Sequence, residues 1–340
     1  MEESKIRTVS LVIIVIFIAG VVLRLAKPVL FPFSLAIFLS FVLYPILDFL
    51  TRVKIPKFIS ILFILVITFL SIYLLSSLFY SSGKSFAAEF PKYGQKINSI
   101  LLSIQERFEL TQLRWEPINW MEQLDLSKIG GFLLFSLGSF FTFLSNLFLI
   151  FIFLVFILAG RGQTKTKISN SFSEDRALII NEVINKIDSQ VQRYLAIKTI
   201  VSLITGFLVT VVLMIFGVDF AIIFGFLTFI LNYIPNIGSF IATTFPLAIA
   251  AFQFETLWPA FWLMLILVII QMLMGNFIEP RLMGKGLGLS PLVILFFLFF
   301  WGWLWGIPGM ILAVPIAAII KIVCNNIPSL KFVGVFMSKE

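Results

Sequence analysis

Asn232-Tyr233-Ile234-Pro235-Asn236-Ile237-Gly238 interrupts a long apolar run in the C-terminal half of the chain. A similar interruption follows at Trp305-Gly306-Ile307-Pro308-Gly309. A further apolar arm comes after each stretch and holds its own proline, Pro246 or Pro315. Proline lacks a backbone donor and disfavours helix in the residue before it. Each stretch therefore predicts a hairpin of two apolar helices, with Pro235 ending the first arm of the first hairpin.

The composition is typical of a membrane protein. The 340 residues are 60% hydrophobic and 12% charged, with a mean hydropathy of +1.08, which excludes a soluble globular domain. Several apolar runs reach the roughly 20 residues that span a bilayer as a helix. We expect spans at about 9–26, 29–50, 58–80, 130–159, 196–217 and 257–277, and hairpins at about 219–252 and 290–323. The first run is interpreted as a retained span, because no small-residue cleavage site ends it.

The predicted fold is an all-α polytopic integral membrane protein with about six spanning helices and two broken, re-entrant hairpins. The re-entrant assignment depends on length, because residues 220–234 would extend only about 22 Å as a helix, less than the ~30 Å of hydrocarbon. The alternative is that tilt or local thinning of the bilayer lets the arms cross it. One spanning helix plus one hairpin crosses the membrane an odd number of times. The second such unit is therefore inverted relative to the first, and inverted repeats place a binding site near the midplane between them.

These elements divide the chain into seven segments. Three N-terminal spans occupy 1–83, an extracytoplasmic amphipathic helical segment occupies 84–129, and the fourth span occupies 130–160. A cytoplasmic amphipathic helix at 161–195 precedes the first repeat unit at 196–252, the second at 253–323 and a cytoplasmic tail at 324–340. We expect both amphipathic segments to lie on the membrane or on a neighbouring subunit, with ligand recognition as the alternative.

The distribution of charge predicts the orientation in the membrane. With a cytoplasmic N-terminus, most of the 25 Lys and Arg residues fall in segments that face the cytoplasm, as the positive-inside rule requires. The outer connections around the first hairpin carry Asp219 and Glu255 and no basic residue. The net charge of +8 is thereby explained without a nucleic-acid partner, since no basic stripe interleaved with exposed aromatic residues is present.

Motifs for catalysis or cofactor binding are lacking. The single cysteine excludes an internal disulfide and a cysteine metal cluster. The chain has no histidine, so any proton coupling must fall to carboxylates. No phosphate-gripping glycine loop, HExxH or GxSxG motif occurs. We therefore expect no enzyme activity, no cofactor and no metal site.

Glu279 is the first candidate for a substrate or ion pathway. It is one of the few acidic residues after residue 195 and stands where a spanning helix ends. At helical spacing it shares a face with Gln271 and Asn276, and ionisable residues at membrane depth usually face partners or pathways. Alternatively, Glu279 pairs with Arg281 or with a helix end and only fixes the packing.

Asn232 and Asn236 flank the first break, where backbone groups from Ile234 to Gly238 lose their helical partners. The two side chains contact substrate, cap these backbone groups, or do both. The candidate pathway residues are Asn232, Pro235, Asn236, Gly238, Gln271, Asn276, Glu279, Arg281, Gly306, Pro308 and Gly309.

The residues around these candidates resemble a known family. Three runs, at 225–238, 276–284 and 306–315, are similar to motifs of the autoinducer-2 exporter family of bacterial permeases. They include Asn232-Tyr-Ile-Pro235, Asn276-Phe-Ile-Glu279-Pro280-Arg281 and Gly306-Ile-Pro308-Gly309. The similar arrangement covers essentially the whole chain, with the specific motifs between about 190 and 323. Ser239 departs from the family, which often has proline there, and this leaves the geometry of that turn open.

The resemblance implies a secondary transporter in the bacterial inner membrane, multi-pass with both termini cytoplasmic, that exports a small polar solute such as the quorum signal autoinducer-2. The lack of a nucleotide-binding motif indicates a proton or sodium gradient as the driving force. The resemblance also implies a homo-oligomer, for which a ring is one arrangement. The family is also linked to sodium/proton antiport, so antiport through Glu279 is the first alternative. A non-transporting membrane scaffold that docks partners through 86–110 and 174–195 is the second. The expected partners are the solute, H+ or Na+, the lipid bilayer and other copies of the chain, with no nucleic acid.

Overall fold

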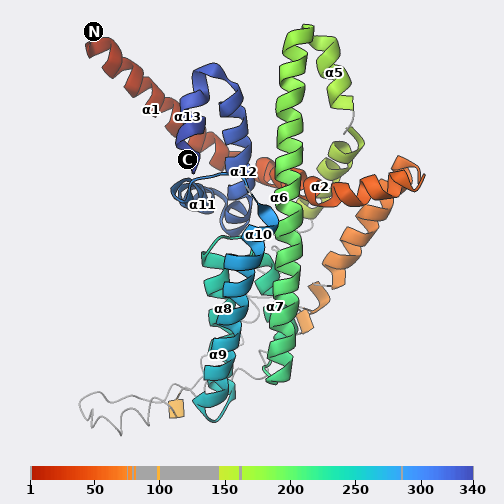
Figure 1. The fold of residues 1–340 in the computed structure, drawn as a ribbon, viewed down its shortest axis with the longest axis vertical. Helices are drawn as coiled ribbons and strands as arrows, with labels where there is room; N and C mark the ends of the chain where they lie inside the picture. The colour runs from red at the N-terminus through yellow and green to blue at the C-terminus, as the bar shows by residue number, and fades with distance from the viewer. Residues whose placement is uncertain are drawn as a thin grey trace, which may run out of the picture. The chain divides into compact units, whose positions relative to one another are not determined.

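The computed structural model describes residues 2–74, 76–78, 80–81, 98–99, 145–160, 163–284 and 286–339. These residues fold into helices joined by short turns, with one isolated β-bridge (Figure 1). Within the described ranges, five helices are long and apolar enough to cross a membrane: Lys27–Arg52, Lys57–Leu78, Glu174–Ile215, Leu257–Met283 and Ile307–Asn326. The predicted all-α polytopic membrane fold is therefore confirmed.

The helices follow the predicted order. The helices labelled in Figure 1 are α1 (Glu2–Leu25), α2 (Lys27–Arg52), α5 (Gln163–Ser171), α6 (Glu174–Ile215), α7 (Ala221–Leu231), α8 (Ile237–Gln253), α9 (Leu257–Met272), α10 (Glu279–Met283), α11 (Pro291–Trp305), α12 (Ile307–Asn326) and α13 (Lys331–Phe336). Two short helices lie between them in the sequence: the π-helix η1 (Leu273–Ile278) and the 3-10 helix η2 (Pro328–Leu330). The predicted spans at 9–26 and 29–50 correspond to α1 and α2. Of the predicted span at 130–159, residues 145–159 are described, and they are helical. The amphipathic segment at 84–129 lies outside the described residues, apart from residues 98–99.

The chain forms two compact units. The first comprises the described residues of Met1–Leu65, Phe143–Ile197 and Met283–Glu340, and the second those of Val66–Thr142 and Lys198–Leu282. Each unit has an aliphatic core. The core of the first unit contains Ala36, Leu47, Ile61, Ile64, Ile150, Leu154 and Leu158. The core of the second contains Val209, Leu213, Val218, Ala221, Ala250, Leu263 and Leu267.

Helix α6 is continuous over 42 residues, about 63 Å at 1.5 Å per residue and twice the ~30 Å of hydrocarbon. The sequence predicted an amphipathic helix up to 195 and a separate span from 196, yet the helix has no break there. Residues 199–215 carry no charge, whereas charged residues recur between 174 and 198. The C-terminal part of α6 is therefore suited to the membrane, and Lys198 stands at the junction.

Both predicted hairpins are present, with α7 packed on α8 and α11 packed on α12. In each hairpin a glycine of the second arm meets the backbone of the first. A Cβ atom at Gly238 would overlap the carbonyl oxygen of Leu231, and one at Gly309 would overlap that of Trp301. The 11 residues of α7 extend about 16 Å, as a re-entrant arm would. Helix α12 differs, because its 20 residues are long and apolar enough to cross.

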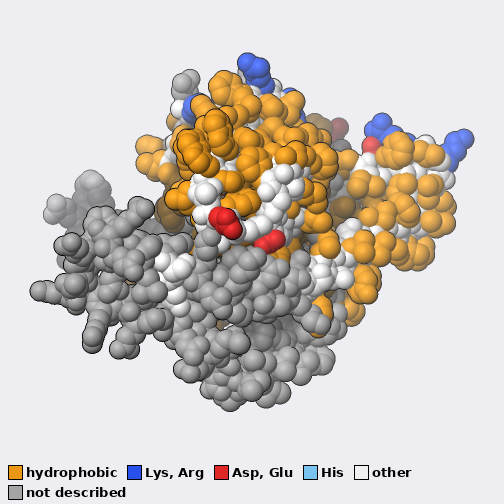
Figure 2. Space-filling view, turned by 90° about the horizontal axis from the view of Figure 1, so that it is seen from below, with side chains coloured by type: hydrophobic (Ala, Val, Ile, Leu, Met, Phe, Trp, Pro, Cys, Tyr) orange, Lys and Arg blue, Asp and Glu red, His pale blue; other side chains and the backbone are white. Residues whose placement is uncertain are grey.

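Large apolar side chains remain exposed on the surface of the second unit. On α9 they include Trp258, Trp262, Leu265 and Ile269. Figure 2 shows hydrophobic side chains over most of the described surface of one face. A soluble protein rarely exposes contiguous apolar patches of this kind, whereas lipid tails solvate them without penalty. The surface therefore agrees with an integral membrane protein.

Candidate functional site

The first break is a tight reversal of the chain. Helix α7 ends at Leu231, before Pro235 is reached, so the prediction that Pro235 ends this arm is wrong. Asn236 has φ 59° and ψ −52°, and the Ile237 N–H donates to the carbonyl of Pro235 at 2.6 Å. This is a γ-turn with positive φ, a rare and strained conformation. Strained backbone of this kind clusters at functional sites.

The backbone around the turn pairs with itself. The Gly238 N–H donates to the carbonyl of Ile234 at 3.1 Å, and the Phe240 N–H donates to that of Asn236 at 3.3 Å. The Asn236 side chain makes no capping bond to α8 and is exposed. The Asn232 side chain is buried and bonds to another helix. The interpretation that the Asn236 side chain caps α8 is therefore wrong, and the described bond of the Asn232 side chain is to Ser202.

Helix α6 places hydroxyl groups against the break. The Asn232 amide donates to the Ser202 hydroxyl at 3.2 Å. The hydroxyls of Thr199 and Tyr233 lie 2.7 Å apart and share a hydrogen bond. Asn232 and Tyr233 of the break thus bond to Ser202 and Thr199, which lie close together on α6. The result is a polar cluster inside an otherwise apolar helical unit.

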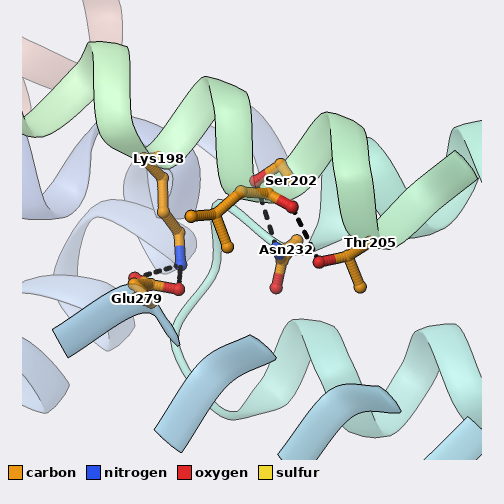
Figure 3. A network of polar contacts seen from close by, with 6 residues as sticks. Lys198, Ser202, Thr205, Asn232 and Glu279 are labelled. Carbon is orange, nitrogen blue, oxygen red and sulfur yellow. Dashed lines mark hydrogen bonds and ion pairs between the residues drawn. The ribbon is translucent and has the colours of Figure 1, made fainter. Parts of the chain in front are cut away.

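Lys198 and Glu279 form a buried ion pair beside these hydroxyls. The Lys198 Nζ lies 2.7 and 2.8 Å from the two carboxylate oxygens of Glu279. The two side chains are only 6% and 16% exposed. Figure 3 shows Lys198 and Ser202 on the same face of α6, directed at Glu279 and Asn232 respectively. Removing two charges from water is unfavourable by several kcal/mol per ion, so such a pair persists only with close, well-directed contacts.

A π-helical segment positions Glu279. The π-helix η1 directly precedes α10, which begins at Glu279. π-Helical turns are rare, change the register of the following residues and occur frequently at functional sites. The α-helical spacing on which Gln271, Asn276 and Glu279 share a face does not continue through this segment. Asn276 is exposed, Gln271 is half-buried, and the Glu279 side chain is mostly buried.

Small residues bring α6 and α7 together. A Cβ atom at Gly206 would lie 2.6 Å from the carbonyl oxygen of Gly225, and one at Gly225 would overlap the side chain of Thr210. Small residues at helix interfaces allow this close backbone approach in membrane proteins. The approach brings Ser202 within hydrogen-bonding distance of Asn232, which follows the end of α7.

The other candidates from the sequence make none of the side-chain contacts described above. Arg281, considered as a partner of Glu279, is exposed, and the described ion pair of Glu279 is with Lys198 instead. The second break belongs to the first unit. There Gly306, with φ 77° and ψ −154°, ends α11 and begins α12. Pro308 lies in the first turn of α12, where proline is well tolerated, and Gly309 packs against α11.

Sequence reasoning missed the residues that α6 contributes. By its position just before an uncharged run, Lys198 resembles the other basic residues of the cytoplasmic segments. One signal was available. Lys198, Ser202 and Thr205 recur at helical spacing on an apolar helix, and all three are buried. Such a polar stripe in an apolar helix faces the protein interior.

The cluster offers one buried carboxylate, one ammonium, three hydroxyls and an amide. These groups can bind a cation or a hydroxyl-bearing solute. Over the part of the chain that the structure describes, no group of three His, Cys, Asp or Glu side chains could hold a metal ion. Glu279 supplies the negative charge in this cluster and Lys198 the positive charge.

Comparison with known proteins agrees with this membrane architecture. Residues 11–329 match the family described as AI-2E family transporter. A protein of Borreliella burgdorferi named "Putative transport protein" is 33% identical over 331 residues, which cover 96% of this chain and 89% of that protein. A Haemophilus influenzae protein of the same name is 34% identical, with 93% and 91% covered. The AI-2 transport protein TqsA of Escherichia coli is 29% identical, with 97% and 94% covered. This chain is therefore a membrane transport protein that belongs to the AI-2E family.

Proposed function

We propose that this protein is a secondary transporter that exports a small polar solute such as AI-2, and that a proton or sodium gradient drives it. The proposal depends chiefly on the buried Lys198–Glu279 ion pair, which lies beside a strained break in an apolar helical hairpin. The name of the Escherichia coli relative, AI-2 transport protein TqsA, supports the choice of solute.

The ion pair gives a physical route for coupling. A proton or sodium ion that reaches Glu279 competes with the ammonium group of Lys198 for the same two oxygens. When the carboxylate is neutralised, Lys198 is left buried without its counter-charge, which is unfavourable by several kcal/mol. The Lys198 ammonium group can leave this unfavourable environment only if α6 and α10 move relative to each other. Ion binding and helix movement are thereby linked.

The groups around the pair suit a hydroxylated solute. Ser202, Thr199 and Tyr233 supply hydroxyl groups, and Asn232 supplies an amide. A few convergent polar groups in an apolar setting are typical of small-molecule sites. The exposed Asn236 side chain, held by the γ-turn, adds a further donor and acceptor at the break. A solute that exchanges its hydrogen bonds with these groups would loosen the contact between α6 and the break.

Sodium/proton antiport is the second candidate, and one observation favours it. Both oxygens of Glu279 already contact a cation, the Lys198 ammonium group, so the site has the geometry for another monovalent cation. In this case the ion pair alone would perform the function, and the hydroxyls would only fix the helices.

Transport in vesicles tests the proposal. Reconstituted protein should export AI-2 faster when a proton or sodium gradient is imposed, and Glu279→Gln should reduce the rate at least tenfold, or about 1.4 kcal/mol in the effective barrier. Glu182→Gln is the matched control, because Glu182 pairs with Lys186 at the surface, with side chains 64% and 44% exposed. Proton movement on sodium addition without AI-2 export would establish antiport instead. An AI-2 export rate that is the same with and without either gradient would contradict the coupling of export to ion movement.

A further inference from the structure

We propose that a pocket on α6, which uses none of the residues of the polar cluster, binds a phosphate group. The cavity has a volume of about 220 Å³, is partly open and lies within the first unit. Its lining includes Ser189, Gln190, Arg193 and Tyr194 of α6, and Gly286 and Leu287 of the loop between α10 and α11.

The pocket lining contains a guanidinium group and no carboxylate. Among the described residues, the ion pairs involve Asp48, Glu182 and Glu279, and none includes Arg193. The Arg193 Nη2 lies 3.9 Å from the position of a Cβ atom at Gly284, so the guanidinium reaches the loop. Its planar fork of donors matches phosphate oxygens in bidentate geometry. An anion in the pocket would therefore meet a positive charge with no competing acid in the lining.

Two carbonyl groups of the loop opposite α6 are hydrogen-bonded. The Lys321 Nζ donates to the carbonyls of Leu287 and Gly288 at 3.1 and 2.6 Å. The Lys339 N–H also donates to Gly288, at 3.0 Å. Because Lys321 neutralises these carbonyl dipoles, the loop does not repel an anion.

The backbone of the loop turns at three glycines. Gly284, Gly286 and Gly288 have φ of 60°, 54° and 58°. The Gly286 amide is already bonded to Met283 at 3.1 Å. Arg193 is therefore the main charged anchor, and the loop supplies shape.

The volume of the pocket and its position along α6 limit which phosphate-bearing ligands fit. A volume of about 220 Å³ is below the ~300–1,000 Å³ of pockets for drug-sized ligands, so a single phosphate group fits better than a nucleotide. Gln190 can add hydrogen bonds, whereas the Ser189 hydroxyl donates to the Lys186 carbonyl at 3.2 Å. On α6 the pocket directly precedes the uncharged residues 199–215. A pocket next to the start of an uncharged span would lie near the lipid phosphates of a membrane surface, where basic pockets bind headgroups.

The test measures binding by thermal unfolding of the purified full-length protein, so it does not depend on transport activity. One arm titrates inorganic phosphate against sodium chloride of equal ionic strength. The other adds phosphatidylglycerol or phosphatidylcholine to the detergent micelles. A ligand that binds only the folded protein raises the unfolding midpoint. We expect a saturable rise whose apparent affinity falls at least tenfold in Arg193→Gln and less in Arg193→Lys, which keeps the charge and loses the fork.

Arg176→Gln is the control, because Arg176 is an exposed cation of the same helix outside the pocket. A response to inorganic phosphate assigns a soluble phosphate site, and a response to phosphatidylglycerol alone assigns a lipid headgroup. Both outcomes support the proposal. It is overturned if neither ligand raises the midpoint, if Arg193→Gln responds as the native protein does, or if Arg176→Gln loses the response equally.

Discussion

Lys198 and Glu279 differ from the other described ion pairs in their burial. The Glu182–Lys186 pair on α6 is largely exposed, and exposed pairs contribute only about 0–1 kcal/mol to stability. The Lys198–Glu279 pair is 6% and 16% exposed. A buried pair is often no more stable than two apolar residues of similar size, yet the loss of one partner leaves a buried charge unpaired. Replacing one partner and replacing both therefore affect stability differently, and comparing each with transport distinguishes a structural role of the pair from a functional one.

We therefore expect Lys198→Met and Glu279→Leu, each alone, to reduce the free energy of unfolding by about 3–5 kcal/mol. The double variant should recover most of that loss, because neither charge remains. Transport should stay at least tenfold below the native rate in all three variants. Thermal unfolding by circular dichroism and vesicle transport measure the two quantities. A double variant that is stable and transports normally would show that the pair only fixes the packing.

At the scale of the helices, the two hairpins depend on glycine at the crossing of their arms. Cβ atoms at Gly238 and Gly309 would overlap carbonyl oxygens of the preceding arm. These atoms belong to the backbone, so the arms themselves must separate to make room. Separation at Gly238 would also pull on the γ-turn at Asn236 and on the bond between Asn232 and Ser202.

Gly238→Ala and Gly309→Ala should each lower the free energy of unfolding by about 1–3 kcal/mol, the usual effect of overpacking. Gly20→Ala is the matched control, because no atom lies within 4 Å of a Cβ atom there and alanine favours helix over glycine. Thermal unfolding of the three variants in the same detergent provides the comparison. An equal midpoint for Gly238→Ala and Gly20→Ala would contradict the close crossing of α7 and α8.

The helices could be predicted from the sequence because apolar length and proline position determine them locally. The breaks near Pro235 and Pro308, and Glu279 as a candidate, follow from the same local rules. The γ-turn at Asn236, the π-helix before Glu279 and the partner Lys198 do not. They depend on the packing of helices that are distant in sequence, and a lysine at the end of a span has the same local pattern whether it faces water or a buried carboxylate.

For the whole molecule, the lone cysteine makes the predicted orientation measurable. Cys324 is buried, so a Cys324→Ala background should fold and leave no thiol. Glu182 lies in the charged part of α6 and Glu255 between α8 and α9, and both are exposed. The positive-inside rule places the first in the cytoplasm and the second outside.

In intact cells, a membrane-impermeant maleimide should therefore label Glu255→Cys in this background and leave Glu182→Cys unlabelled until the cells are lysed. The rule predicts this because basic residues gather in 161–198, whereas the connections around the first hairpin carry only Asp219 and Glu255 as charges. Labelling of the cysteine-free background would reveal an unrelated target and serves as the control. The reverse pattern would invert the whole topology. It would also place the charged part of α6, residues 174–198, on the outer side of the membrane. This part contains Lys198 and lines the phosphate pocket.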